Sequence, residues 1–317
     1  MKKRVIVAAI LIAVLGGAFA LRLINNYGVY FFDLIVAAVC VFCALEFSKL
    51  ISANGVPASQ MAAGIYPSLM FAGHMLFFVF ELKPYFYAVI QLSILLAAML
   101  VTFIVYLCLK TKQIQAYCEE KKINKLTYAS RVALKSALTF VYPSCFLLAL
   151  MLLNRIDAFS SSNVELFKGN LGWVALIVTF LIPILTDTFA MLCGMLFKGP
   201  KLCPKISPNK TISGSICATI LTSLVCGAFF YVFNAFGVVA NGFSRLGIQV
   251  WHFVILGFVG AIVCQLGDLF ESFIKRRANV KDSGNIFPGH GGFLDRFDSH
   301  IFNAPFVLAF FIFAFII

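Results

Sequence analysis

The chain has 317 residues, of which 62% are hydrophobic and only 12% are charged. Soluble domains carry about 25% charged residues, so this composition excludes an ordinary soluble globule, a disordered chain and a small disulfide-stapled fold. It predicts an all-α polytopic membrane protein, since one helical span needs about 20 apolar residues. In a membrane protein, the net charge of +12 is explained by basic residues that set the orientation of the helices. Therefore no nucleic acid is expected as a partner.

Nine apolar segments follow one another along the chain. They predict about nine transmembrane helices, at approximately 5–24, 29–51, 60–81, 85–109, 132–153, 170–196, 213–237, 246–270 and 300–317. The first segment follows Met1-Lys2-Lys3-Arg4, as a signal peptide would. Because no clear cleavage site precedes Arg22, we interpret this segment as a retained helix.

The basic residues predict the orientation of these helices. If the N-terminus is cytoplasmic, 20 of the 25 basic residues fall on the cytoplasmic side. We therefore expect a cytoplasmic N-terminus and a multi-pass protein of the cell (inner) membrane. The chain is expected to form one membrane domain, with an N-terminal transmembrane region at 1–165 and a C-terminal region at 166–317 that carries the polar motifs.

Polar residues concentrate at the end of the eighth predicted span. Asp268, Glu271, Ser272 and Lys275 are spaced i, i+3, i+4 and i+7, so a helix places them on one face. One interpretation is a charged helix end that reaches the membrane surface. The stripe begins deep in the apolar segment, however, and a carboxylate at that depth is costly and usually functional. We therefore favour a functional site.

The next residues form a glycine-rich segment with further charges. Asp295 and Asp298 are spaced i, i+3, so one helical turn aims both carboxylates the same way, and such oxygen ligands suit Mg²⁺ beside substrate phosphates. His290 stands among glycines and is interpreted as a turn residue or phosphate contact rather than a general base. The flanking basic residues suit a metal-bound polyphosphate: Lys275, Arg276, Lys281 and Arg296. The alternative is an ordinary solvated loop.

A second cluster follows the sixth predicted span, within which Asp187 lies. Residues 197–211 contain four lysines, three prolines and no acidic residue. Ser207 and Lys210 in this loop suit phosphate oxygens, although basic loops are also common on the cytoplasmic side of a membrane protein. Both clusters fall on the same predicted side, which favours one site.

The stretch from Ser272 to Asp298 reads Ser-Phe-Ile-Lys-Arg-Arg-Ala-Asn-Val-Lys-Asp-Ser-Gly-Asn-Ile-Phe-Pro-Gly-His-Gly-Gly-Phe-Leu-Asp-Arg-Phe-Asp. This stretch closely resembles the signature of phosphatidate cytidylyltransferases. We call residues 272–298 the signature segment. Gly267-Asp268-Leu-Phe-Glu271 and the stretch from Asp187 to Thr211 are also similar to that family. Two positions depart from it: Ser213 stands where the family usually has Glu, and Met195 where it usually has Arg.

The resemblance implies transfer of CMP from CTP to phosphatidate in the lipid bilayer, giving CDP-diacylglycerol and pyrophosphate. It implies that Asp268 and Asp295 hold Mg²⁺, with Asp298 and Glu271 bound to the ion or to its ligands and Asp187 as a further candidate. The expected catalytic residues are Asp268, Lys275, Asp295 and Arg296, with phosphate contacts from Ser207, Lys210, Ser272, Arg276, Lys281 and His290. A second, monovalent cation and a homodimer are left open.

One alternative function lies within the same chemistry, and another belongs to a different class. A related membrane enzyme that uses CTP on another lipid, such as a polyprenol kinase, lacks the complete His-Gly-Gly-x-x-Asp-Arg-x-Asp pattern. An ion-coupled transporter that binds cations at Asp187, Asp268 and Glu271 predicts an inverted repeat. The N-terminal half contains no counterpart of residues 265–299, and a structural scaffold would not need this concentration of polar groups.

Overall fold

The architecture is almost entirely helical. The computed structural model describes residues 16–22, 27–53, 55–83, 85–159, 171–235, 248–287 and 291–315. Eight helical stretches among them are long and apolar enough to cross a membrane. This confirms the all-α polytopic class, and the chain is a multi-pass membrane protein. Most of the first predicted span, 5–24, lies outside the described residues, and the membrane orientation stays a prediction.

The chain divides into two compact units. Unit 1 comprises Met1–Leu148 and Arg277–Asp295, and unit 2 comprises Ala149–Arg276 and Arg296–Ile317. Unit 1 thus includes most of the signature segment together with the N-terminal helices, whereas the two regions expected from the sequence, 1–165 and 166–317, were each continuous.

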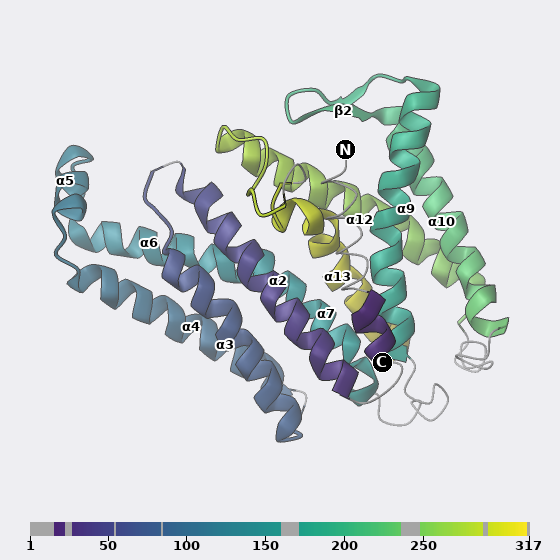
Figure 1. Ribbon diagram of the computed structural model, residues 1–317, viewed down its shortest axis with the longest axis horizontal. Helices are drawn as coiled ribbons and strands as arrows, with labels where there is room; N and C mark the ends of the chain where they lie inside the picture. Colours follow the sequence, from purple (N-terminus) through teal and green to yellow (C-terminus); the bar gives the residue numbers. More distant parts are fainter. Residues whose placement is uncertain are drawn as a thin grey trace. The chain divides into compact units, whose positions relative to one another are not determined.

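Unit 1 is built from apolar helices that lie side by side (Figure 1). α2 packs on α3, and α4 packs on both α3 and α6. Most apolar side chains of α4 are exposed, as expected for a helix that faces lipid tails. The elements are α2 (Tyr27–Ser52), α3 (Gln60–Val79), α4 (Tyr85–Cys108), α5 (Lys112–Glu120), α6 (Lys125–Thr139), the π-helical η1 (Phe140–Cys145) and the start of α7 (Phe146–Asn154).

A lysine fixes the C-terminal end of α2. Lys135 of α6 donates from Nζ to the carbonyl oxygens of Ile51, at 2.9 Å, and Val56, at 2.7 Å. The last carbonyls of a helix have no partner within the helix, and a cation there also complements the helix dipole. Lys135 therefore holds the end of α2, close in sequence to Glu46.

Unit 2 contains a pair of long helices joined by a β-hairpin. α9 and α10 pack along each other, and the hairpin projects past their connected ends (Figure 1). The Asp157 carboxylate stabilises the N-terminal end of α9, because it accepts the N–H groups of Leu171 and Gly172, each at 3.1 Å. The elements are η2 (Ile156–Phe159), α9 (Leu171–Phe197), β1 (Lys201–Cys203), β2 (Ser207–Thr211), α10 (Ile212–Ala235), α12 (Val250–Arg277) and most of α13 (Leu294–Phe315).

Glycines of α12 let neighbouring helices approach closely. A Cβ atom at Gly257 would overlap Cys226 of α10, and one at Gly267 would lie 2.8 Å from the Asp298 carbonyl oxygen of α13. Small residues at helix contacts are typical of membrane proteins, where packing rather than water exclusion drives association. The contact at Gly267 brings the backbones of α12 and α13 together beside Asp268.

Two local features differ from the sequence prediction. Residues 201–211, expected as a loop, pair as an antiparallel hairpin with Cys203 opposite Ser207. The prolines there do not prevent pairing, because each strand of a two-stranded sheet is an edge and can omit a donor. The last helix begins at Leu294 rather than near residue 300, because the Glu46 carboxylate accepts the N–H groups of Phe293 and Leu294 at its start.

Candidate active site

A cavity of about 630 Å³ opens in unit 2, among the hairpin, α9, α10 and α12. This volume lies within the range of about 300–1,000 Å³ that is typical of small-molecule sites. Three lysines, two carboxylates and several uncharged polar side chains line it: Lys198, Lys201, Lys210, Asp187, Asp268, Asn209, Thr211, Ser215 and Gln265. Mixed charges of this kind suit a polyanion that is accompanied by a cation.

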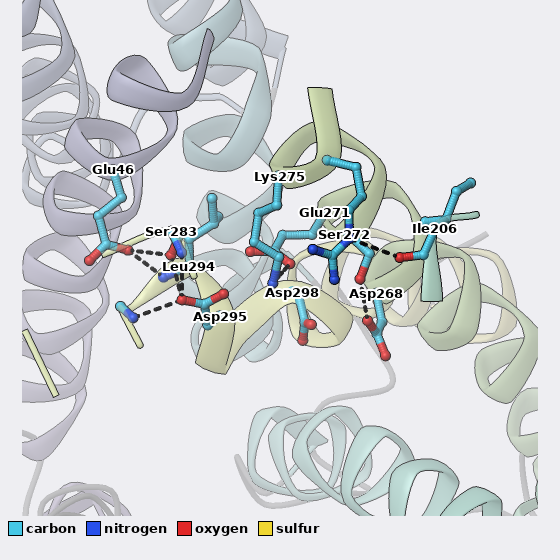
Figure 2. A network of polar contacts seen from close by, with 12 residues as sticks. Glu46, Ile206, Asp268, Glu271, Ser272, Lys275, Ser283, Leu294, Asp295 and Asp298 are labelled. Atoms are coloured by element: carbon cyan, nitrogen blue, oxygen red, sulfur yellow. Dashed lines mark hydrogen bonds and ion pairs between the residues drawn. The ribbon is translucent and has the colours of Figure 1, made fainter. Parts of the chain in front are cut away.

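Lys210 and Asp268 form an ion pair at this cavity. Lys210 comes from β2 and Asp268 from α12, and their side chains are 24% and 23% exposed, so a ligand can still reach both. Ser272, one helical turn beyond Asp268, points at the same carboxylate and donates to it at 3.3 Å (Figure 2). Asp268 therefore orients the ammonium group of Lys210 and is itself oriented by Ser272.

Backbone contacts hold the hairpin that presents the lysines. Ile212 N–H donates to the Pro200 carbonyl at 2.9 Å and closes the base of the hairpin. At the opposite end, Arg276 donates from Nε to the Ile206 carbonyl at 3.3 Å (Figure 2). Because the hairpin is tied at both ends, Lys201 and Lys210 enter the cavity from a fixed support.

The two departures from the family pattern have different local settings. Ser213 accepts the Gly199 N–H at 3.2 Å, and a Cβ atom at Gly199 would overlap the Ser213 side chain. Ser213 therefore supports the base of the hairpin. Met195 lines the cavity and is 59% exposed, so this part of the cavity wall carries no charge in this chain.

One helix carries Asp268, Glu271, Ser272 and Lys275, as the spacing predicted. Glu271 is completely buried and forms an ion pair with Lys275 one turn later (Figure 2). A buried carboxylate is stable only when opposite charge or hydrogen bonds compensate for the loss of hydration. The observed role of Glu271 is thus to pair with Lys275, and its predicted contact with a metal ion stays a prediction.

Glu271→Gln should destabilise the protein, because the substitution removes the buried carboxylate that pairs with Lys275. Breaking a buried pair by removing one partner typically costs about 3–5 kcal/mol. Thermal unfolding in detergent measures the effect. The matched control is Glu120→Gln, which removes the carboxylate of the exposed Glu120–Lys121 pair and should leave the melting temperature close to that of wild type, because solvent screens the pair. Equal melting temperatures for the two variants would contradict the prediction.

The carboxylates of unit 2 fit a magnesium ion that also binds water and substrate phosphates better than a metal site made entirely of protein ligands. Asp187 and Asp268 line one cavity, and Asp298 lies near enough to Asp268 for their charges to interact. Among the residues that the structure describes, no three His, Cys, Asp or Glu side chains form a group able to hold a metal ion. Mg²⁺ often takes only one or two carboxylates, completed by water and substrate phosphates. The oxygen ligands present fit that pattern.

Asp295 braces the signature segment within unit 1. Its Oδ2 accepts from Ser283 N–H, Ser283 Oγ and Gly292 N–H, each at 2.8 Å (Figure 2). Gly291 has a φ of +80°, a conformation that side chains rarely adopt, and a Cβ atom there would overlap the Asp295 carboxylate. Asp295 thus joins residues 283 and 292, and its expected role as a metal ligand stays a prediction.

Glu46 of α2 also contacts the signature segment, which the sequence did not indicate. Its carboxylate accepts the N–H groups of Phe293, at 3.1 Å, and Leu294, at 2.8 Å. In the sequence Glu46 is an isolated acidic residue near the end of an apolar span, and such residues usually reach toward water. The only available signal was a carboxylate inside a hydrophobic helix.

The predicted site residues are divided between the two units. Of these, Asp187, Lys210 and Asp268 line the cavity, while Arg296 and Lys281 are exposed at the surface. Unit 2 holds Asp187, Ser207, Lys210, Asp268, Glu271, Ser272, Lys275, Arg276, Arg296 and Asp298, and unit 1 holds Lys281 and Asp295. His290 lies outside the described residues.

Comparison with known proteins bears on the whole chain. The family model described as "Cytidylyltransferase family" matches residues 2–314. The chain belongs to the cytidylyltransferase family. The family resemblance expected from the signature segment is therefore confirmed.

Similar curated proteins share a name. Proteins called phosphatidate cytidylyltransferase from Rickettsia felis and Rickettsia prowazekii are 46% and 47% identical over 119 residues, which cover 38% of this chain and 50% of each relative. The protein of that name from Staphylococcus haemolyticus is 42% identical over 130 residues, covering 41% of this chain and 46% of the relative. The chain spans about half the length of the curated relatives it matches.

Proposed function

We propose that this cytidylyltransferase acts on phosphatidate in the inner membrane, transferring CMP from CTP to give CDP-diacylglycerol and pyrophosphate. The observation that carries the proposal is the cavity in which Lys198, Lys201 and Lys210 lie beside Asp187 and Asp268. Lysines bind phosphate oxygens as point charges, and carboxylates beside them suit the cation that accompanies a triphosphate. The signature segment and the name shared by the relatives support the same substrates.

The proposed reaction needs positioning rather than a strong base. A phosphate oxygen of phosphatidate bonds to the α-phosphorus of CTP, while the bond from that phosphorus to the oxygen bridging to the β-phosphorus breaks. The leaving pyrophosphate takes the electron pair. Because the attacking oxygen is already anionic, the protein must mainly hold two polyanions in line and offset their charge.

The residues of the cavity divide this work. Lys198, Lys201 and Lys210 offset the phosphate charges, and Asp268 keeps the Lys210 ammonium group in place. Asp187 and Asp268 are the side chains that would hold Mg²⁺. When bound, this ion would neutralise phosphate oxygens and stabilise the pyrophosphate leaving group.

The test is product formation by the purified protein in detergent–phosphatidate micelles with labelled CTP. We expect Mg²⁺-dependent CDP-diacylglycerol. Lys210→Met should raise the KM for CTP by roughly 10-fold or more, because a hydrogen bond to a charged group is worth about 1.5–3 kcal/mol. The matched control is Lys205→Met, which removes a lysine of the same hairpin that does not line the cavity and should leave KM unchanged.

Two results would contradict the proposal. One is folded, dispersed wild-type protein that forms no CDP-diacylglycerol. The other is an equal effect of Lys210→Met and Lys205→Met, which would assign the lysines only to membrane topology. Transfer of the terminal phosphate of CTP to a polyprenol would instead support the lipid-kinase alternative.

A further inference from the structure

Glu46 makes a dense set of contacts with residues far away in the sequence. It lies on α2, its side chain is 3% exposed, and all its partners belong to the same unit. Oε1 accepts Phe293 N–H at 3.1 Å. Oε2 accepts Leu294 N–H at 2.8 Å and lies 3.1 Å from Ser283 Oγ (Figure 2). A buried carboxylate is costly unless hydrogen bonds compensate, and the two backbone N–H groups of Phe293 and Leu294 provide that compensation.

Two glycines of the signature segment leave room for this carboxylate. A Cβ atom at Gly284 or at Gly292 would overlap the Glu46 carboxylate. Neither glycine has a positive φ, so the requirement comes from the approach of Glu46 and not from an unusual backbone conformation. Glu46 is therefore enclosed by the segment on two sides.

An aromatic contact from the same helix strengthens the attachment. Phe42 lies one turn before Glu46 on α2 and stacks on Phe293, with ring centroids 4.8 Å apart and planes inclined by 9°. Phe287 also packs on Phe293, with ring centroids 4.6 Å apart. One stretch of α2 thus binds the segment through both an apolar and a charged contact.

The bonds from Glu46 fall at the start of α13. Leu294 begins that helix, and the first N–H groups of a helix lack partners within it. A carboxylate placed there satisfies them and complements the positive end of the helix dipole. Asp295, Arg296 and Asp298 follow within the next turn of the same helix, so Glu46 determines where that turn starts.

We infer that Glu46 is a positioning residue for the proposed cytidylyl transfer: it holds residues 283–284 and 292–294 on α2 and thereby sets the first turn of α13, which carries Asp295, Arg296 and Asp298. The inference rests on the proposed function for its kinetic consequence. Glu46 acts through the backbone of the signature segment and is not assigned a contact with substrate.

The kinetic test compares Glu46→Gln with Asp33→Asn. Asp33 is also a buried carboxylate on α2, where it pairs with His74 at 3.5 Å. It lies 13 residues before Glu46, or about 20 Å along a helix. Glu46→Gln places an amide N–H₂ against backbone donors, and we expect kcat to fall by about 100-fold, the cost of a misplacement of about 1 Å, with little change in the KM for CTP. Asp33→Asn, corrected for the folded fraction, should stay within about threefold of wild type.

A double-mutant cycle isolates the contact itself. Gly292→Ala alone should lower kcat by about 100-fold, because its methyl group displaces the Glu46 carboxylate. In a Glu46→Ala background, Gly292→Ala should cost less than about threefold more, because the space is then empty. A Gly292→Ala effect of equal size in both backgrounds would overturn the inference.

Amide hydrogen exchange tests the attachment without turnover. The N–H groups of Phe293 and Leu294 should exchange at least about 10-fold faster in Glu46→Gln than in wild type, but not in Asp33→Asn. Unchanged exchange overturns the attachment even if the enzyme is active. A wild type that forms no CDP-diacylglycerol, with exchange as expected, overturns the proposed function and the kinetic role together. If Glu46→Gln does not fold, Glu46→Asp withdraws the carboxylate by one methylene and must show the same faster exchange.

Discussion

Asp268→Asn should lower the kcat/KM for CDP-diacylglycerol formation by about 10³-fold. The substitution removes the counter-charge of Lys210 and one of the two carboxylates that line the cavity. It also changes the acceptor of the Ser272 hydroxyl. An uncharged amide is a poorer ligand for Mg²⁺ and no longer orients the Lys210 ammonium group, so both the affinity for the triphosphate and the rate of transfer should fall.

The control for this variant is Glu119→Gln, which removes an exposed carboxylate on α5. Labelled-product assays over a range of CTP concentrations measure both variants, and thermal unfolding in detergent establishes that each is folded. We expect Glu119→Gln to match wild type. If Asp268→Asn retained most of the wild-type rate, the cavity would not be the site of transfer, and the proposed function would need another location.

Asp295→Asn should lower the turnover rate by about 100-fold through the geometry of the signature segment. Three donors converge on one carboxylate oxygen of Asp295, from Ser283 N–H, Ser283 Oγ and Gly292 N–H. Hydrogen bonds to an ionised acceptor are about twice as strong as neutral ones, so the amide oxygen of Asn holds this segment less firmly.

Titration with Mg²⁺ separates this bracing role from direct metal binding. If Asp295 acts mainly as the brace that the structure shows, the Mg²⁺ concentration for half-maximal rate should shift by less than about threefold, while the maximal rate falls. A shift as large as the one in Asp268→Asn would instead place Asp295 at the ion. A variant with wild-type kinetics would contradict both roles.

The local chemistry of α12 and of the signature segment was accessible from the sequence. The spacing of Asp268, Glu271, Ser272 and Lys275 predicted one helical face, and the structure confirms one helix with pairs between residues four apart. Such pairs depend only on helix geometry, so they follow from residue numbers. The all-α membrane class followed in the same way, because the composition leaves no soluble alternative.

Pairs between distant residues were not accessible in this way. His74 showed no polar neighbours in the sequence, yet it lies buried between Asp33, at 3.5 Å, and the Tyr87 hydroxyl, at 3.0 Å. Lys210 and Asp268 were expected to belong to one site, but their ion pair was not predicted. The order of residues along the chain does not indicate which polar side chains meet between helices.

Composition, apolar spacing and the signature segment thus determined by themselves that the chain is a helical, multi-pass membrane protein whose acidic and basic residues cluster in the C-terminal half. These properties depend on residue type and on short-range periodicity. The tertiary structure alone decided that Lys198 and Lys201 share a cavity with Asp268, and that Glu46 holds the segment at residue 294. A buried charge is stable only where helices bring its partners to it, and that arrangement is a property of the packed helices rather than of the sequence around the charge.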